Sequence, residues 1–202
     1  MLRCDDDNMR DAILTILDFI FPTKIDIKKL GKSPRANKHR MPFIFSYYSY
    51  QTPIIRLAMR RLKTQPIAYI IDHFADRLID VANDLNLDKD MIIVPVPIHK
   101  SRRNERGYNQ SELLSIAFTK KFGGRLSKDI VMRVKSGRKQ STIKARDERW
   151  KNVLGNFAAV NVERKKYLII DDISTTGATI SEIRRCLLGA GAESVIAITV
   201  AH

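Results

Sequence analysis

Apolar residues recur at intervals of three and four along several parts of the chain, a pattern that predicts amphipathic helices. The clearest example runs from about Pro66 to Leu85, and a shorter one runs from about Thr52 to Lys63 with Pro53 at the first helical position. The other segments of this kind are 9–20, which stops before Pro22, 109–122, which Gly123 and Gly124 close, and a segment around Ile180 to Leu188, which Gly189 or Gly191 ends.

Short runs rich in β-branched residues lie between the predicted helices and indicate buried strands. These runs are 91–96, 167–170 and 195–200, and the aromatic segment 43–50 is a further candidate. A strand, a helix and a strand at this spacing imply a right-handed parallel crossover, so we expect an α/β fold with a mainly parallel sheet flanked by helices. Segment 23–40 contains Gly, Ser and Pro without periodicity, and we expect a loop or partial disorder there.

The composition of the 202 residues is that of a globular protein, with 44% hydrophobic and 29% charged residues. No apolar run approaches the ~20 residues that cross a bilayer, so we expect no membrane span. The start of the chain, with Asp5, Asp6 and Asp7, is unlike a secretory signal and favours a cytoplasmic protein. The two cysteines, Cys4 and Cys186, are too few for a disulfide framework or a four-cysteine zinc site, and we expect reduced thiols.

The basic residues outnumber the acidic ones by 36 to 22, which gives a net charge of +14. Most of this excess lies in one third of the chain, because the stretch from His99 to Lys166 contains 19 Lys or Arg and 6 Asp or Glu. A concentrated basic block indicates a surface that meets polyanions, either phosphorylated small molecules or nucleic acid. A solvated basic face is the alternative interpretation.

Acids, hydroxyls and a glycine follow the predicted strand 167–170. Asp171 and Asp172 come at its carboxyl end, where side chains of a parallel sheet face a ligand crevice and can bind a cation or sugar hydroxyls. The loop 174–179 then enters a helix, so its N–H and O–H groups and the helix dipole can hold a phosphate. Ser and Thr also cap ordinary helices. Two acids, three threonines and Gly177 in this order favour phosphate binding.

This segment resembles the phosphoribosyl pyrophosphate (PRPP) signature of type I phosphoribosyltransferases. Further blocks are similar to the ComF family of competence-associated, phosphoribosyltransferase-like proteins: Val94-Pro-Val-Pro-Ile-His99, Arg102 and Arg103 with Arg106-Gly-Tyr-Asn-Gln110, and Arg138-Lys-Gln-Ser-Thr142 followed by Arg146 and 152–157. The resemblance covers about Phe43 to the end of the chain. Segment 16–22 resembles the lead-in to that family's zinc finger, but 23–26 lacks the cysteines that would follow. We therefore expect no zinc.

The resemblance implies a type I phosphoribosyltransferase fold over 43–202, preceded by an N-terminal helix and a degenerate zinc-finger-like region over 1–42 that contributes a hood. It implies that Asp171 and Asp172 bind the ribose hydroxyls of PRPP, directly or through Mg²⁺. It assigns the 5′-phosphate to Ser174, Thr175, Thr176, Gly177, Ala178 and Thr179. It assigns the pyrophosphate to Pro97, Ile98, His99, Lys100, Arg102, Arg103 and Arg106, and a flexible lid to Arg138, Lys139 and Gln140.

The activity that the resemblance implies is transfer of ribose 5-phosphate with release of pyrophosphate, in association with DNA uptake. Such a displacement passes through an oxocarbenium-like state, which requires a stabilised leaving anion and exclusion of water. Two other functions remain open: a single-stranded-DNA-binding competence accessory protein, with a DNA-uptake helicase or other competence proteins as partners, and a regulator that binds PRPP without turnover. His99 is a phosphate ligand, a general acid or a hydrogen-bonded turn residue.

Overall fold

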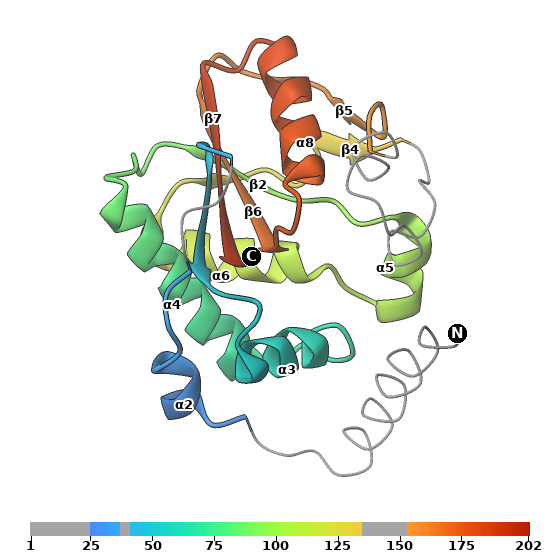
Figure 1. Cartoon of the computed structure of the whole chain (residues 1–202). Helices are drawn as coiled ribbons and strands as arrows, with labels where there is room; N and C mark the ends of the chain where they lie inside the picture. Colours follow the sequence, from blue (N-terminus) through green and yellow to red (C-terminus); the bar gives the residue numbers. More distant parts are fainter. Residues whose placement is uncertain (1–24, 37–40, 135–152) are drawn as a thin grey trace, which may run out of the picture.

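A five-stranded sheet forms the centre of the protein in a computed structural model that describes residues 25–36, 41–134 and 153–202 (Figure 1). Each pair of neighbouring strands is parallel. The order across the sheet is β1 (Ile44–Tyr48), β7 (Ser194–Ala201), β6 (Lys166–Ile173), β2 (Ile92–Pro95) and β3 (Arg125–Leu126). The expected α/β fold with a parallel sheet is therefore confirmed, and segment 43–50 supplies an edge strand.

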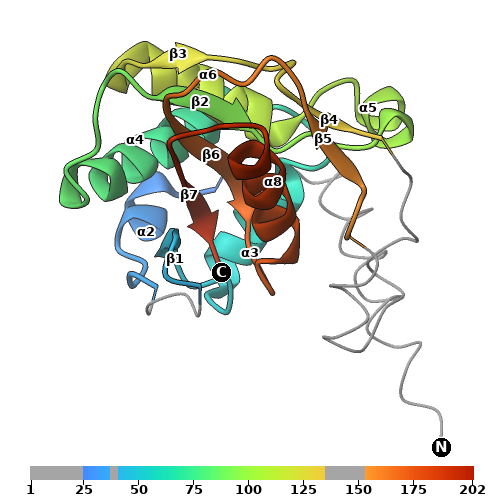
Figure 2. The same cartoon turned by 90° about the horizontal axis from the view of Figure 1, so that it is seen from above.

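Helices cover both faces of this sheet. The helices are α2 (Ile27–Gly31), α3 (Pro53–Arg61), α4 (Ala68–Asp84), α5 (Lys100–Arg106), α6 (Gln110–Phe122) and α8 (Ala178–Gly189). Figure 2 shows α4 and α8 on opposite sides of the sheet. Helix α6 packs against α4 on one face, and α8 packs on the other against a small antiparallel pair, β4 (Val131–Arg133) and β5 (Phe157–Ala159).

The two faces of the sheet bury separate sets of apolar side chains, because neighbouring residues of a strand point in opposite directions. In β6, Leu168 and Ile170 contribute to the core beneath α4 and α6. Tyr167 and Ile169 contribute to the core beneath α8. A central strand that is buried on both faces carries no alternation of polar and apolar residues, which is why segment 167–170 is uniformly apolar in the sequence.

The helix boundaries follow the sequence signals closely. Helix α4 spans most of the predicted 66–85 segment, and α6 begins after Asn109, whose side chain accepts a hydrogen bond from the Ser111 N–H at 3.2 Å. Gly123 closes α6 with a φ of 105°, a left-handed backbone that favours glycine. Helix α3 begins at Pro53 after Thr52 as predicted, but the Thr52 hydroxyl makes no capping hydrogen bond.

Three sequence expectations need correction. Strand β6 does not end before the acids but continues to Ile173, because β7 remains paired with it as far as Ala201. Segment 23–40 contains helix α2, which Asp26 caps and which buries Leu30. The short elements α5, β3, β4 and β5 were not predicted. The expected helix 9–20 lies outside the described residues, and no helix within the described part is long and apolar enough to cross a membrane.

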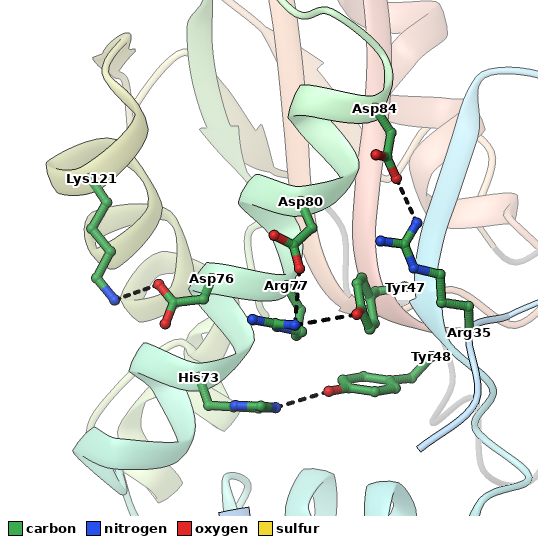
Figure 3. Close-up of polar contacts among 9 residues, drawn as sticks. All are labelled: Arg35, Tyr47, Tyr48, His73, Asp76, Arg77, Asp80, Asp84 and Lys121. Atoms are coloured by element: carbon green, nitrogen blue, oxygen red, sulfur yellow. Dashed lines mark hydrogen bonds and ion pairs between the residues drawn. The ribbon is translucent and has the colours of Figure 1, made fainter. Parts of the chain in front are cut away.

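Polar contacts hold α4 against its neighbours, as Figure 3 shows. The hydroxyl of Tyr48 in β1 lies 2.8 Å from Nε2 of His73 in α4. On another side of α4, Lys121 of α6 forms an ion pair of 2.7 Å with Asp76. Further contacts join Arg77 to Tyr47 and Asp80, and Arg35 to Asp84. These contacts join α4 to β1, to α6 and to the segment that carries Arg35.

Candidate functional site

A cavity of about 380 Å³ opens beside the carboxyl ends of β6 and β2. Its walls come from the end of β6 and the start of α8, from the β2–α5 connection, from the first residues of α6, and from single residues near α3 and β4. In a parallel α/β sheet, ligands bind at this edge because the loops and helix N-termini converge there. Most of the residues that the sequence assigned to PRPP lie in this one cavity.

The two acids at the end of β6 line the cavity together. The Ser111 hydroxyl donates a hydrogen bond of 2.7 Å to Asp171 Oδ1, and the Asp172 N–H donates one of 2.9 Å to the same oxygen. Burial and the adjacent Asp172 carboxylate raise the pKa of Asp171 well above its usual range, whereas these two donors lower it. Burial beside a second carboxyl group therefore disfavours the ionised form of Asp171.

The loop 174–179 between β6 and α8 lines the cavity along its whole length. The Ser174 N–H is tied to the Ala201 carbonyl at the end of β7, with a distance of 3.0 Å. Gly177 adopts a left-handed φ of 77° at the N-cap of α8. Within the described part of the chain, the N–H groups of Thr175, Thr176 and Gly177 meet no acceptor. Free N–H groups at the start of a helix form an anion-binding site.

Cationic side chains from several elements also line the cavity. Arg102 and Arg106 come from α5, Lys63 follows α3, and Arg133 comes from β4. Arg106 also donates to the side-chain oxygen of Gln110 at 3.3 Å. Arg102 and Arg133 both line this cavity, and burial together with the positive charge of Arg102 lowers the pKa of Arg133. Such a cluster of positive charge suits an anionic ligand with several oxygens.

Some residues of the predicted site do not line the cavity. His99 is the N-cap of α5, and its Nδ1 accepts from the Ser101 N–H at 3.2 Å, which matches the turn interpretation. Arg103 forms an ion pair of 3.1 Å with Glu112. Lys100 is exposed on α5 and is absent from the cavity wall. The proposed lid residues Arg138, Lys139 and Gln140 lie outside the described residues.

Several lining residues were missed in the sequence: Tyr50, Lys63, Gln110, Ser111 and Arg133. For two of them a signal exists, because Gln110 ends the Arg106–Gln110 block and Ser111 directly follows it. The other three carry no local signal. Tyr50, for example, reaches the cavity because β1 lies beside β7, and its N–H donates to the His202 carbonyl at 2.8 Å.

The described residues fit a magnesium ion that takes one or two carboxylates from the protein and its remaining ligands from water and substrate. They contain no group of three or more His, Cys, Asp or Glu side chains that could form an all-protein metal site. Asp171 and Asp172 nevertheless offer hard oxygen donors beside a phosphate-type loop. Mg²⁺ is commonly bound by one or two carboxylates together with water and substrate phosphates, so these acids suit it.

A parallel sheet with paired acids at the end of one strand, followed by a phosphate-type loop into the next helix, defines an α/β protein of the type I phosphoribosyltransferase-like fold. No protein-family model matches the chain. Curated relatives do match it. Competence protein ComFC of Bacillus subtilis is 31% identical over 156 residues, which are 77% of this chain and 62% of that protein.

Two further relatives match about half of the chain. Competence protein F of Haemophilus influenzae is 36% identical over 107 residues, which are 51% of this chain and 46% of that protein. DNA utilization protein YhgH of Escherichia coli is 34% identical over 104 residues, which are 51% of this chain and 45% of that protein. The chain thus spans less than two thirds of the length of each of these relatives. Together these matches identify it as a ComF family protein.

Proposed function

We propose that this chain binds PRPP with Mg²⁺ and transfers its ribose 5-phosphate group to an acceptor, releasing pyrophosphate. In this reaction the bond from the anomeric carbon to the pyrophosphate oxygen breaks, and a bond from that carbon to the acceptor forms. The observation that carries the proposal is that paired acids, a phosphate-type loop and a cationic wall line one cavity.

The low cysteine content supports a cytoplasmic setting.

Each part of the cavity suits one part of PRPP. The amides of loop 174–179 and the start of α8 suit the 5′-phosphate, because free N–H groups and the helix dipole attract a dianion. Asp171 and Asp172 suit the ribose hydroxyls as hydrogen-bond acceptors. Arg102 and Arg106 suit the pyrophosphate, whose negative charge grows as the bond to carbon breaks. Bound Mg²⁺ would supply additional positive charge for the same leaving group.

A thermal shift experiment tests the proposal. We expect PRPP with Mg²⁺ to raise the melting temperature of the full chain, because a ligand that binds only the folded state stabilises it by mass action. We expect the shift to vanish in the double variant Asp171→Asn with Asp172→Asn, measured against that variant without ligand. An equal shift in the double variant would reject the assignment of the acids. Pyrophosphate release across a panel of acceptors then separates turnover from binding alone.

A second candidate function is single-stranded DNA binding in DNA uptake, with a DNA-uptake helicase or other competence proteins as partners. The names of the relatives support it, since they refer to competence and DNA utilization. Several cations of the basic block are paired with carboxylates in the described structure: Arg103, Lys121, Arg125, Lys128 and Lys166. Segment 135–152, which contains many of the other basic residues, lies outside the described residues.

Salt dependence tests this second candidate. Binding that neutralises several DNA phosphates weakens steeply as salt rises. We expect the charge reversals Arg138→Glu and Lys139→Glu to weaken such binding and to flatten its salt dependence. DNA binding that ignores both changes would remove this segment from the candidate interface.

A further inference from the structure

Ser111 is the second residue of α6 and lies against one of the two acids of the cavity. Its hydroxyl donates a hydrogen bond of 2.7 Å to Asp171 Oδ1. The residue is 3% exposed, and it belongs to the cavity wall. The hydrogen bond of this nearly buried hydroxyl thus joins the start of α6 to the end of β6, beside the candidate sugar site.

Among the described residues, Ser111 is the side chain that ties the Asp171 carboxylate to another element of the fold. The second donor on Oδ1 is the N–H of Asp172, which belongs to the same strand and moves with it. The terminal torsion of an aspartate has a broad energy minimum, so a carboxylate without an outside partner samples many orientations. With Oδ1 held by Ser111, the carboxylate keeps one plane relative to the cavity.

The helix start that carries Ser111 is itself held in place. The side chain of Asn109 accepts from the Ser111 N–H and donates to the Val96 carbonyl at the end of β2, with a distance of 3.0 Å for the second bond. The side-chain nitrogen of Gln110 donates to the Leu62 carbonyl after α3, also at 3.0 Å. These bonds restrain the position of Ser111 independently of the orientation of the Asp171 side chain.

We propose that Ser111 is a positioning residue for sugar recognition, whose hydroxyl holds Asp171 in the orientation that accepts hydrogen bonds from the vicinal hydroxyls of a ribose 5-phosphate group. This inference rests on the proposed function. The hydrogen bonds of Ser111 go to Asp171, Asn109 and Ser115, and none goes to the phosphate loop or to the cationic residues of the cavity. Loss of the Ser111 hydroxyl therefore weakens the binding of ligands that contain the sugar and leaves the binding of pyrophosphate unchanged.

Titration calorimetry of the full chain with two probes tests this inference. The probes are ribose 5-phosphate and inorganic pyrophosphate, each with Mg²⁺. We expect Ser111→Ala to weaken the binding of ribose 5-phosphate about tenfold, the factor expected for one hydrogen bond to a charged group. We expect the affinity for pyrophosphate to change by less than about twofold. Ser111→Thr, which keeps a hydroxyl, should restore the binding of ribose 5-phosphate.

Ser115→Ala is the matched control. Ser115 is also a buried serine of α6, and its hydroxyl donates to the Ser111 carbonyl at 2.7 Å without contact to Asp171. We expect its affinity for both probes to equal that of the wild type. In an Asp171→Ala background, Ser111→Ala should cause no further loss, because the two residues act through one contact. If Ser111→Ala does not fold, Ser111→Cys, a weaker donor of similar size, replaces it.

Three outcomes would overturn the role of Ser111: unchanged binding of ribose 5-phosphate in Ser111→Ala, equal losses for both probes, or the same loss in Ser115→Ala. A wild-type chain that binds neither probe would instead overturn the proposed function. The two failures are thus distinguishable in one set of titrations.

Discussion

Glu182 in α8 accepts a hydrogen bond of 2.7 Å from the backbone N–H of Gly155, in the turn that precedes β5. The Glu182 carboxylate is 5% exposed, and it also pairs with Arg185 at 2.8 Å. The Arg185 guanidinium and the Gly155 N–H lower the pKa of Glu182. Because β5 pairs with β4, which carries Arg133, this contact links the cationic wall to the helix that begins at the phosphate-type loop.

Glu182→Ala should lower the free energy of unfolding by about 1–3 kcal/mol, since it leaves a partly buried N–H without its acceptor. Chemical denaturation measures this change. Arg185→Met is the control, because the Arg185 side chain is 62% exposed and its ion pair contributes at most about 1 kcal/mol. Equal losses in the two variants would show that the ion pair, and not the bond to Gly155, matters.

Arg102 and Arg103 are neighbours in the sequence but have different surroundings. Arg102 lines the cavity, whereas Arg103 is paired with Glu112. We expect Arg102→Met to weaken the binding of inorganic pyrophosphate by roughly 10- to 100-fold, the range for losing a charge-assisted hydrogen bond. Arg103→Met should change it by less than about threefold. Similar losses in calorimetry would contradict the separation of these two arginines.

Asp171→Asn should stabilise the protein in the absence of ligand. The pKa of Asp171 is raised on folding, so the folded state loses stability as the pH rises above 3.8, and the full penalty is present once the pH exceeds the folded pKa. The asparagine carries no charge and can still accept from Ser111. We therefore expect the melting temperature of Asp171→Asn at pH 7.5 to lie above that of the wild type.

The matched control for this variant is Asp84→Asn. Asp84 is an exposed carboxylate paired with Arg35, and such pairs contribute little. We expect little change in melting temperature for this control. A fall in melting temperature for Asp171→Asn would contradict the account, because it would mean that the ionised acid stabilises the folded chain.

His73 should make the stability depend on pH. Burial and Arg77 lower its pKa, Asp76 and Asp80 oppose them, and its ring is paired with the Tyr48 hydroxyl (Figure 3). The folded state therefore holds a neutral ring, and the free energy of unfolding falls as the pH drops below 6.5 toward the folded pKa.

His73→Gln, which does not titrate, should flatten the decline in stability between about pH 7 and pH 5. His202, whose pKa is also lowered by burial, stays in both proteins and contributes equally to each curve. Urea denaturation at a series of pH values gives the two slopes. An unchanged slope would remove His73 as a source of the dependence.

The sequence predicts those parts of the fold that repeat a pattern over many residues. Helices α4 and α6 and the strands β2, β6 and β7 all carry such patterns, and the predicted segments overlap them. Strands β3, β4 and β5 have only two or three residues each, too few to show a period. Their positions depend on contacts with distant segments.

The candidate site likewise contains residues that the sequence predicts and residues that only the fold reveals. Asp171 and the loop 174–179 were predicted because a strand, acids and a helix start adjoin in the sequence, and the structure brings them together in the cavity. Tyr50 and Arg133 reach the cavity from other elements and carry no local signal, so only the packed fold reveals them. Conversely, Arg102 and Arg103 are adjacent arginines of α5 that look alike in the sequence. Only the structure shows that Arg102 lines the cavity and that Arg103 is paired with Glu112.

A crystal structure of the full chain with PRPP and Mg²⁺ would show where the ligand binds. We expect density for the 5′-phosphate against the amides of loop 174–179, with the ribose hydroxyls next to Asp171 and Asp172 and the pyrophosphate next to Arg102. A fully occupied ligand elsewhere on the protein, or a cavity that stays empty at saturating PRPP, would contradict this expectation.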